Sequence, residues 1–395
     1  MERSKDLGER NGSGGARAAV MKAPGRLELE RFPVPDPAPG AALLEMSYSG
    51  ICGTDKHTFR GETLQYAGTP HERQIEYPLI CGHENVGTIA AIGGSEPLLD
   101  SEGARLKPGD RVVPAANLAC GTCWYCSSGQ AYYLCERLDD YGNSLNAKAP
   151  PHLFGGWAEY LYILPGTPLF RVPDELPDEI AVLTEPMAVT HGFELARRLY
   201  NGSFGESVAV IGVGPLGMCH LIKAKLLGCG KLIAIDRLPS RIEMAGRFGA
   251  TLGLNAAELE EDELLARVRE HTGGRGPDIV LDCSGVPETF VTSLRMARVG
   301  GTVVESGAFV DMGPVAINPN ADICTKNVNV LGVGGETAES YRPAMELLVR
   351  NMDRLPLDQL VTHRMALEDA QSALEIAQSD GAMKVVLSGS IAPAA

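Results

Sequence analysis

Residues 207–217 read SVAVIGVGPLG, an apolar run that leads directly into a Gly-x-Gly-x-x-Gly turn. Glycine suits this turn because the turn is tight, because the backbone approaches a pyrophosphate closely and because the next helix packs on the strand. The start of that helix offers unpaired N–H groups to phosphates. The motif taken alone is weak evidence, and a Gly-rich turn without a ligand is the alternative. The residues predicted to form the nucleotide turn are Gly212, Gly214, Pro215, Leu216 and Gly217.

The segments downstream of this turn alternate between short apolar runs and stretches of helical period. Such alternation predicts parallel strands joined by right-handed crossovers, which form a doubly wound α/β sheet. The strand candidates are 207–212, 231–236, 278–282, 301–306 and 328–332. The alternation begins near Glu185, so a separate domain is expected from there to about residue 332.

The second strand candidate ends in Asp236, 19 residues after Gly217. A carboxylate at this position accepts hydrogen bonds from the ribose hydroxyls of NAD and repels a 2′-phosphate. NAD is therefore favoured over NADP. The adjacent guanidinium of Arg237 is a candidate cofactor residue that would tolerate the phosphate, and its alternative is a solvated surface charge.

The composition is that of an ordinary globular protein. Of 395 residues, 44% are hydrophobic and 22% are charged, which excludes disorder, coiled coil and fibrous classes for most of the chain. Fifty acidic against 35 basic residues leave a net charge of −15, so neither nucleic acid nor an anionic membrane surface is an expected partner. Residues 1–17 are rich in charge and glycine and are interpreted as a flexible extension.

The chain before residue 186 is rich in short strand-like runs cut by proline and glycine. It contains CGTCWYCSSGQAYYLC, in which Cys120, Cys123, Cys126 and Cys135 have the spacing C-x2-C-x2-C-x8-C. Four thiolates this close in sequence can close a tetrahedral shell around Zn²⁺, the signature of a structural site. A pair of disulfides, an iron–sulfur cluster and a redox CxxC motif are the alternatives. The crowding of these cysteines favours metal binding in a reducing cytoplasm over disulfides in secretion.

A second group of potential ligands is spread over three segments: Cys52, the pair His83 and Glu84, and Glu185. Cysteine, histidine and glutamate from separate segments, with one position left for water or substrate, distinguish a catalytic zinc from a structural one. Spacing alone leaves the alternatives open, because a lone cysteine is usually a small buried side chain and a lone histidine usually has an ordinary polar role.

The sequence resembles the zinc-dependent medium-chain dehydrogenase/reductase family, and most closely its sorbitol, glucose and threonine dehydrogenases. The matching stretches extend over nearly the whole chain in family order. They are CGTDKH, YPLICGHENVGTIAAIG, KPGDRVV, the four-cysteine segment, GGWAEY, LTEPMAV, VIGVGPLG, DCSG and VGGTVVESG. The resemblance implies a Rossmann domain over 187–332 and a GroES-like catalytic domain over 18–186 and 333–395, with a structural zinc lobe at 117–137.

The resemblance also implies residue roles. Cys52 and His83 would bind the catalytic zinc, with Glu84 as an exchangeable ligand or close neighbour. Glu185 stands where alcohol dehydrogenases proper have a cysteine, as in the polyol-type members, and would hold zinc directly or through water. Thr54 would pass on the proton of the substrate hydroxyl, and His57 would carry it through the nicotinamide ribose to solvent.

Two further residue groups complete the expected site. Asp55 would orient the ring of His83 from behind. Residues 58–76 form a polar stretch longer than in the shortest family members, so Arg60, His71 and Arg73 are candidates for lining the substrate cleft. Their alternative is a solvated loop.

The predicted function is that of an NAD- and zinc-dependent dehydrogenase, with two zinc ions per chain. It would oxidise a secondary alcohol such as a polyol, sugar or hydroxy amino acid. Two alternatives stay open: an NADPH-dependent carbonyl reductase, and a catalytically silent protein that binds zinc and NAD. The resemblance also implies a homodimer or homotetramer.

Overall fold

The structure is a computed structural model that describes residues 14–69, 71–199 and 205–389. The chain divides into two compact units, one of residues 1–185 and 337–395 and the other of residues 186–336. The sequence placed the second boundary at 332. Residues 333–336 instead belong with the second unit, because Val333 is buried there and the carbonyl of Gly335 lies 3.2 Å from Nε2 of His191.

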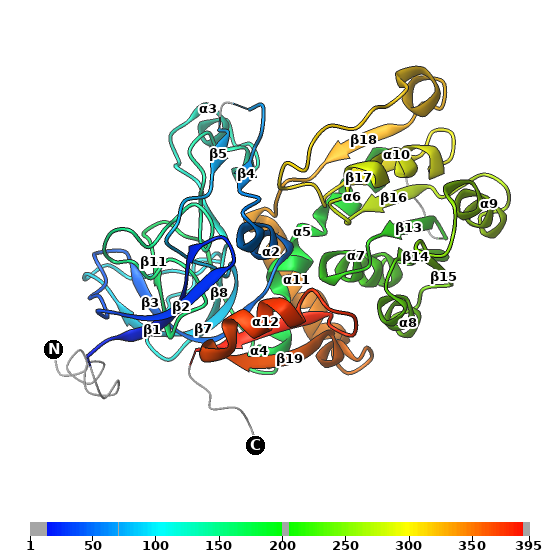
Figure 1. The fold of residues 1–395 in the computed structure, drawn as a ribbon. Coiled ribbons are helices and arrows are strands. Elements are labelled where there is room, and N and C mark those ends of the chain that lie inside the picture. Colours follow the sequence, from blue (N-terminus) through cyan, green and yellow to red (C-terminus); the bar gives the residue numbers. More distant parts are fainter. Residues whose placement is uncertain (1–13, 70, 200–204, 390–395) are drawn as a thin grey trace. The chain divides into compact units, whose positions relative to one another are not determined.

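The second unit contains a six-stranded sheet in the order β15-β14-β13-β16-β17-β18, with every pairing parallel (Figure 1). The order reverses between β13 and β16, which is the feature of a doubly wound fold that creates a ligand crevice. Its strands are β13 (Ser207–Ile211), β14 (Lys231–Asp236), β15 (Leu252–Asn255), β16 (Ile279–Asp282), β17 (Thr302–Glu305) and β18 (Asn329–Gly332). The five predicted strands and the fold class are confirmed.

The sequence missed β15. This strand contains Gly253, has only one buried residue in four, and lies at the edge of the sheet, so it lacks the apolar run that marked the others. The connecting helices are α6 (His191–Leu199), α7 (Pro215–Leu226), α8 (Pro239–Arg247), α9 (Glu261–His271) and α10 (Pro287–Met296). Side chains of the strands and of α9 and α10 pack into one hydrophobic core.

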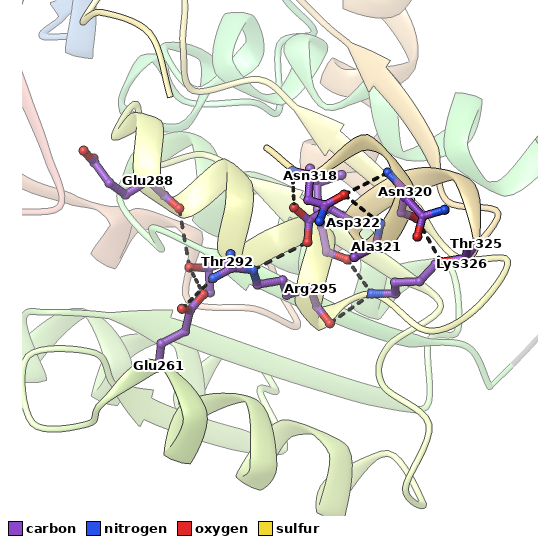
Figure 2. Close-up of polar contacts among 11 residues, drawn as sticks. Glu261, Glu288, Thr292, Arg295, Asn318, Asn320, Ala321, Asp322, Thr325 and Lys326 are labelled. Carbon is purple, nitrogen blue, oxygen red and sulfur yellow. Dashed lines mark hydrogen bonds and ion pairs between the residues drawn. The ribbon is translucent and has the colours of Figure 1, made fainter. Parts of the chain in front are cut away.

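A polar network attaches the segment before β18 to the body of this unit (Figure 2). Arg295 of α10 donates to Glu261 at 2.9 Å and lies 3.6 Å from Asp322, which belongs to the π-helical segment η2 (Pro319–Cys324). Lys326 donates to the carbonyl of Leu294 at 2.6 Å. These contacts hold the approach to the edge strand β18 against α10.

The first unit is built around a seven-stranded sheet whose central strands are β7, β3 and β20. Its strands are β3 (Ala42–Gly50), β7 (Glu84–Ile92), β8 (Arg111–Pro114), β11 (Tyr160–Ile163), β12 (Leu169–Arg171), β19 (Val361–Ala366) and β20 (Lys384–Ser388). The smaller sheets use β1 (Ala16–Ala23), β2 (Arg26–Phe32), β4 (Leu64–Gln65), β5 (Arg73–Gln74), β6 (Leu79–Ile80), β9 (Asn117–Leu118) and β10 (Asp139–Asp140). The predicted β-rich, GroES-like class is confirmed.

The helices of the first unit are mostly short. They are α2 (Gly53–Arg60), α3 (Trp124–Ser127), α4 (Asp178–Ala181), α5 (Thr184–Val189), which crosses the unit boundary, α11 (Ala338–Asn351) and α12 (Ala370–Ile376), with 3-10 turns η1 (Tyr132–Leu134), η3 (Leu357–Leu360) and η4 (Leu367–Asp369). Within the described residues, no helix is both long enough and apolar enough to cross a membrane.

The predicted boundary of the flexible extension, at residue 17, is wrong by two residues. Residues 1–13 lie outside the described residues, but β1 already begins at Ala16, which is fully buried. The backbone N–H of Arg17 donates to the Glu159 carboxylate at 2.7 Å, and its side chain donates to the same group at 2.8 Å. These contacts make residues 16 and 17 part of the folded sheet.

The return of the chain after residue 337 places β20 beside β3. This pairing joins residues more than 300 positions apart in sequence, with Val386 opposite Gly50. Because Cys52 follows β3 directly, the C-terminal segment forms one wall of the site described next.

Candidate functional site

The structure brings Cys52, His83 and Glu84 together. Cys52 caps the N-terminus of α2, and His83 directly precedes β7, which begins at Glu84. One ligand atom from each of the three residues lies within 4.8 Å of the others. His83 and Glu84 are only 7% and 1% exposed, whereas Cys52 is partly buried. A thiol, an imidazole and a carboxylate at this separation fit a zinc ion.

Cys52 and His83 perturb each other strongly. Burial raises the pKa of the Cys52 thiol, but attraction to the His83 ring and a hydrogen bond from it lower that pKa below its ordinary value. Burial opposes the charged form of His83, yet the thiolate, Asp55 and Glu185 raise the pKa of the ring well above its ordinary value. Both shifts favour the thiolate of Cys52, which is the form that binds metal. Glu185, in the first turn of α5, is 6% exposed and acts on His83 electrostatically.

Glu84 has a partner that sequence reasoning did not anticipate. Lys384, the first residue of β20, is 1% exposed, and its Nζ lies 2.6 Å from Oε1 and 2.5 Å from Oε2 of Glu84. The same ammonium group donates to the carbonyl of Ile51 at 3.2 Å. A buried carboxylate needs such a pair. Both Glu84 oxygens are therefore engaged by Lys384, which holds Glu84 in place beside Cys52 and His83 from β20.

Thr54 and Asp55 lie in the first turn of α2, beside Cys52. The Thr54 Oγ1 atom is buried and has no hydrogen-bond partner within the described part of the chain. Asp55 accepts a bond from the backbone N–H of Cys52 at 2.8 Å. Nδ1 of His83 does not bond to Oδ1 of Asp55, because neither atom has a hydrogen-bond partner among the described residues. Asp55 acts on the ring through its charge alone.

His57 lies one turn further along α2 and is partly buried. Its Nδ1 is 2.6 Å from the Glu62 carboxylate. Burial lowers the pKa of the ring below its ordinary value and outweighs the opposing effect of Glu62. The ring is therefore neutral near pH 7, as a proton acceptor must be.

The structure also brings the four cysteines of the lobe together, with one sulfur atom of each residue within 4.8 Å of the others. The Sγ atoms of Cys123 and Cys126 are 3.4 Å apart, and those of Cys123 and Cys135 are 3.9 Å apart. A disulfide requires about 2.05 Å, and all ten cysteines of the chain are free. The disulfide alternative is therefore wrong.

Backbone N–H groups donate to sulfur atoms of this lobe, although burial still raises the pKa of Cys135 to about 12. Cys135 accepts from the N–H of Cys120 at 3.2 Å and from that of Arg137 at 3.3 Å. The Arg137 guanidinium lies 3.6 Å from the sulfur of Cys120. Hydrogen bonds from Thr122, chiefly, lower the pKa of Cys120 to about 5. These donors offset part of the negative charge of a four-thiolate site.

The nucleotide turn has the predicted geometry. Gly214 caps α7 without a side-chain hydrogen bond, and Pro215 opens the helix. Gly212 has a positive φ of 80°. A Cβ atom at Gly217 would lie 2.0 Å from the carbonyl oxygen of Gly212, so only glycine allows the helix to pack this close to the turn. The exposed N–H groups of the helix start suit a pyrophosphate.

Asp236, at the end of β14, is 8% exposed. Its Oδ1 accepts from the backbone N–H groups of Arg237 and Leu238 at 2.8 and 3.0 Å. Its Oδ2 faces Arg241 at 3.7 Å, and Arg241 also lies 3.5 Å from where a Cβ of Gly214 would stand. The guanidinium beside the nucleotide turn is therefore that of Arg241, which the sequence reading missed in favour of Arg237. The sequence did offer a signal for Arg241, because it is a basic residue five positions after Asp236 in the first turns of the next helix.

The three residues expected to line a substrate cleft have other partners. Arg73 donates to the carbonyl of Leu138 at 2.6 Å, pairs with Asp140 and lies over the ring of Tyr66. His71 contacts the same ring edge-on. Arg73 therefore attaches the loop to the segment that follows the four-cysteine lobe, whereas the contact of His71 lies within the loop itself. Arg60 lies beside His57 on α2.

Comparisons with known proteins agree with this geometry. The family described as alcohol dehydrogenase GroES-like domain matches residues 38–174, and the family described as zinc-binding dehydrogenase matches residues 215–350. The chain is 31% identical to 5-exo-hydroxycamphor dehydrogenase of Pseudomonas putida over 378 residues, which cover 95% of this chain and 99% of that protein. The chain belongs to the zinc-dependent medium-chain dehydrogenase family.

Solved structures of dehydrogenases share the fold. An alcohol dehydrogenase of Thermotoga maritima matches with a TM-score of 0.84 and 29% identity, covering 95% of this chain and 99% of that one. A zinc-binding dehydrogenase of Sinorhizobium meliloti bound to NADP matches with a TM-score of 0.79 and 26% identity, covering 95% and 100%. The predicted family is confirmed, and membership identifies the protein as an oxidoreductase of the alcohol and polyol dehydrogenase type.

Proposed function

We propose that this medium-chain dehydrogenase oxidises a secondary alcohol to the carbonyl compound with NAD⁺, using one catalytic and one structural zinc ion per chain. The observation that carries the proposal is the cluster of Cys52, His83 and Glu84, beside which the Thr54 hydroxyl is buried with no partner among the described residues. A metal position and an unpaired hydroxyl side by side suit the binding and deprotonation of an alcohol. The hydroxycamphor relative is named for a secondary alcohol.

The cluster would hold zinc through Cys52 and His83, with Glu185 completing the set directly or through water. When bound, the zinc would lower the pKa of an alcohol hydroxyl toward neutrality, as it lowers that of water to about 7, and the nicotinamide would accept hydride. The chain's own residues would position the alcohol and move its proton. The Thr54 hydroxyl would accept a hydrogen bond from the alcohol, and the neutral ring of His57 would receive the proton and release it to solvent.

Glu84 has a different role in this scheme. Its carboxylate is neutralised by Lys384, so it adds little net negative charge to the cluster. A ligand set with fewer uncompensated negative charges would leave a bound zinc ion more Lewis-acidic. The Glu84–Lys384 pair therefore favours an acidic substrate hydroxyl at neutral pH.

The preference for NAD rests on Asp236, whose carboxylate is fixed by two backbone N–H groups at the position expected for the ribose. The second candidate is an NADP(H)-dependent reductase, favoured by Arg241 at 3.7 Å from that carboxylate and by the Sinorhizobium relative solved with NADP. Asp236→Ala should raise the relative use of NADP⁺, and Arg241→Gln in that background should reverse the gain. An unchanged cofactor ratio in Asp236→Ala would contradict the ribose assignment.

The direct test of the function is a substrate screen with NAD⁺ and NADP⁺ side by side. The panel would hold cyclic secondary alcohols, polyols, sugars and threonine at mildly alkaline pH. Formation of NADH with secondary alcohols in the intact protein, and its absence in Cys52→Ser, supports the proposal. Cofactor binding by calorimetry without turnover on any alcohol or carbonyl compound would favour the catalytically silent alternative.

The protein is also proposed to act as a homodimer or homotetramer. The support is an edge strand: β18 ends the six-stranded sheet, and its Val330 is 42% exposed. Unpaired edges are usually covered, most simply by a second copy in symmetric assembly. Light scattering after size-exclusion chromatography should give a mass of two or four chains, and a monomer at micromolar concentration would contradict this.

A further inference from the structure

The end of helix α2 turns the chain back onto His57. Gly61 ends the helix with a positive φ of 84°, a conformation that side chains other than glycine's rarely adopt. The N–H of Glu62 then donates to the carbonyl of His57 at 3.0 Å, and the N–H of Gly61 donates to the backbone carbonyl of Thr58 at 3.0 Å. This turn places Glu62 beside His57, five positions earlier in the sequence. The Glu62 side chain is therefore placed against His57 by the backbone itself.

Two groups compete for Nδ1 of His57. The Glu62 carboxylate is at 2.6 Å and a guanidinium nitrogen of Arg60 is at 3.2 Å. A carboxylate can only accept, whereas a guanidinium can only donate, so the two contacts demand opposite states of Nδ1. Both contacts involve a charged group, and the carboxylate contact prevails because it is the shorter by 0.6 Å. The neutral ring therefore carries its proton on Nδ1 and presents the lone pair of Nε2.

The other charged neighbours of the ring oppose Glu62. Arg60 and Lys56 both disfavour a positive ring, and burial acts in the same direction. Arg60 is held by Glu62 at 3.1 Å and by Gln378, after α12, at 2.9 Å, while Lys56 donates to the carbonyl of Ala377 at 2.8 Å. These two partners, the Gln378 side chain and the Ala377 carbonyl, carry no charge. Glu62 is the group that favours the protonated ring.

We propose that Glu62 is a positioning residue for proton release: it fixes the His57 tautomer so that Nε2 is the accepting atom, and Arg60 counterbalances it. The inference rests on the proposed function of His57. In the step, Nε2 gains the proton that left the alcohol, Nδ1 keeps its proton on the bond to Glu62, and the Nε2 proton then passes to water. Protons balance, and Glu62 remains a carboxylate throughout.

The first test measures the histidine alone. The full-length protein labelled at histidine ring carbon would be titrated by NMR without substrate, with His57 assigned from His57→Asn. Glu62→Gln should lower the pKa of His57 by roughly one unit, since an adjacent opposite charge is worth about one to three. Arg60→Gln should move the pKa upward. An unchanged His57 titration in Glu62→Gln would overturn the proposal whatever the enzyme does.

The second test measures the reaction. In alcohol oxidation the ring must be neutral, so the acid limb of the kcat/KM profile should follow the pKa of His57. Glu62→Gln should shift this limb to lower pH and reduce the plateau roughly tenfold, the low end of the cost of losing a partner that orients a histidine. Glu62→Asp should restore part of the plateau. If the NMR titration of His57 shifts but the kinetic profile does not, His57 is not the proton relay. That result would overturn the proposed role of His57, and the proposal for Glu62 with it.

A matched control separates these effects from surface charge. Glu76 pairs with Lys148 at the surface, with its side chain 62% exposed, and has no place in the proposed machinery. Glu76→Gln removes the same charge and should change neither the His57 titration nor the acid limb. Melting temperatures close to that of the parent protein would show that the Glu62 variants are folded, as expected for a side chain that is one-third exposed.

Discussion

The two clusters of this chain that could each hold a metal ion are built in opposite ways. The four-cysteine lobe draws its ligands from 16 consecutive residues and surrounds them with backbone N–H donors. The cluster of Cys52, His83 and Glu84 joins the end of one strand to the start of another, and its carboxylate is held by Lys384 from the other end of the chain. The first cluster is local and has four protein ligands, whereas the second is assembled by the fold and has fewer.

This difference in construction predicts that the lobe serves stability and the second cluster serves reactivity. A shell of four thiolates would be complete, so a metal bound there would hold a loop in shape and have no open position for substrate. A cluster of mixed ligands leaves such a position and depends on the surrounding sheet for its geometry. Damage to the lobe should therefore affect folding first, and damage to the second cluster should affect turnover first.

The largest effect is expected from Cys52→Ser. Loss of a thiolate ligand should reduce alcohol oxidation by roughly 1,000-fold or more, because a catalytic metal contributes several kcal/mol and each 1.4 kcal/mol is a factor of ten. The melting temperature should change by only a few degrees. Steady-state kinetics and thermal unfolding check both parts. Cys324→Ser, at an exposed cysteine, is the control and should leave turnover unchanged.

Substitution in the four-cysteine lobe should reduce stability more than turnover. Cys135 is 1% exposed, and its replacement by serine should cost about 5 kcal/mol or more of unfolding free energy through loss of the structural metal. Molecules that remain folded and loaded at the other site should keep most of their turnover. Denaturant unfolding and activity per folded molecule measure the two quantities. Abolished turnover with an unchanged unfolding midpoint would contradict the division of roles.

Substitutions in the buried pair of Glu84 and Lys384 show how much the stability of the second cluster depends on a residue far away in sequence. Lys384→Met should destabilise the protein by about 3 to 5 kcal/mol, because it leaves a carboxylate buried without its partner. Glu84→Gln combined with Lys384→Met should recover much of that loss. A double-mutant cycle in urea measures the coupling. Equal destabilisation by the single and double variants would show that the pair contributes packing only.

The smallest effect concerns a buried ionisable group that belongs to neither cluster. His220 of α7 is fully buried, neither ring nitrogen has a partner within the described residues, and burial chiefly lowers its pKa to about 3. Between pH 6.5 and about 3 the unfolded chain binds a proton here and the folded chain does not, so stability falls as pH falls. His220→Leu should remove up to about 1.4 kcal/mol per pH unit of this dependence. Urea unfolding at pH 7, 6 and 5 checks the slope; equal slopes in both proteins would contradict the assignment.

Local patterns explain what the sequence predicted well. The lobe, the nucleotide turn and five strands of the parallel sheet are each encoded within a few consecutive residues. The glycine spacing around Gly212 and the cysteine spacing from Cys120 report directly on short-range geometry. The resemblance to the family added the grouping of Cys52 with His83, which spacing alone left open.

Long-range partners explain what it missed. Lys384 lies 300 residues from Glu84, and nothing in its own segment marks it as buried. Arg241 became a neighbour of Asp236 only through the placement of α8 on the sheet. The guanidinium of Arg73 was expected near substrate and instead binds the lobe, because charge in a polar loop does not reveal which carboxylate the fold places beside it. Edge strand β15 lacked the apolar run on which strand prediction depends.

Zinc content is the most direct test of the central claim that the chain holds two metal sites of different construction. Elemental analysis of the purified protein should give two zinc ions per chain. Cys52→Ser should retain one and remain folded, and Cys135→Ser should lose the lobe ion. Two zinc ions in Cys52→Ser, or a single ion in the parent protein that Cys135→Ser alone removes, would show that Cys52 and His83 do not form a metal site.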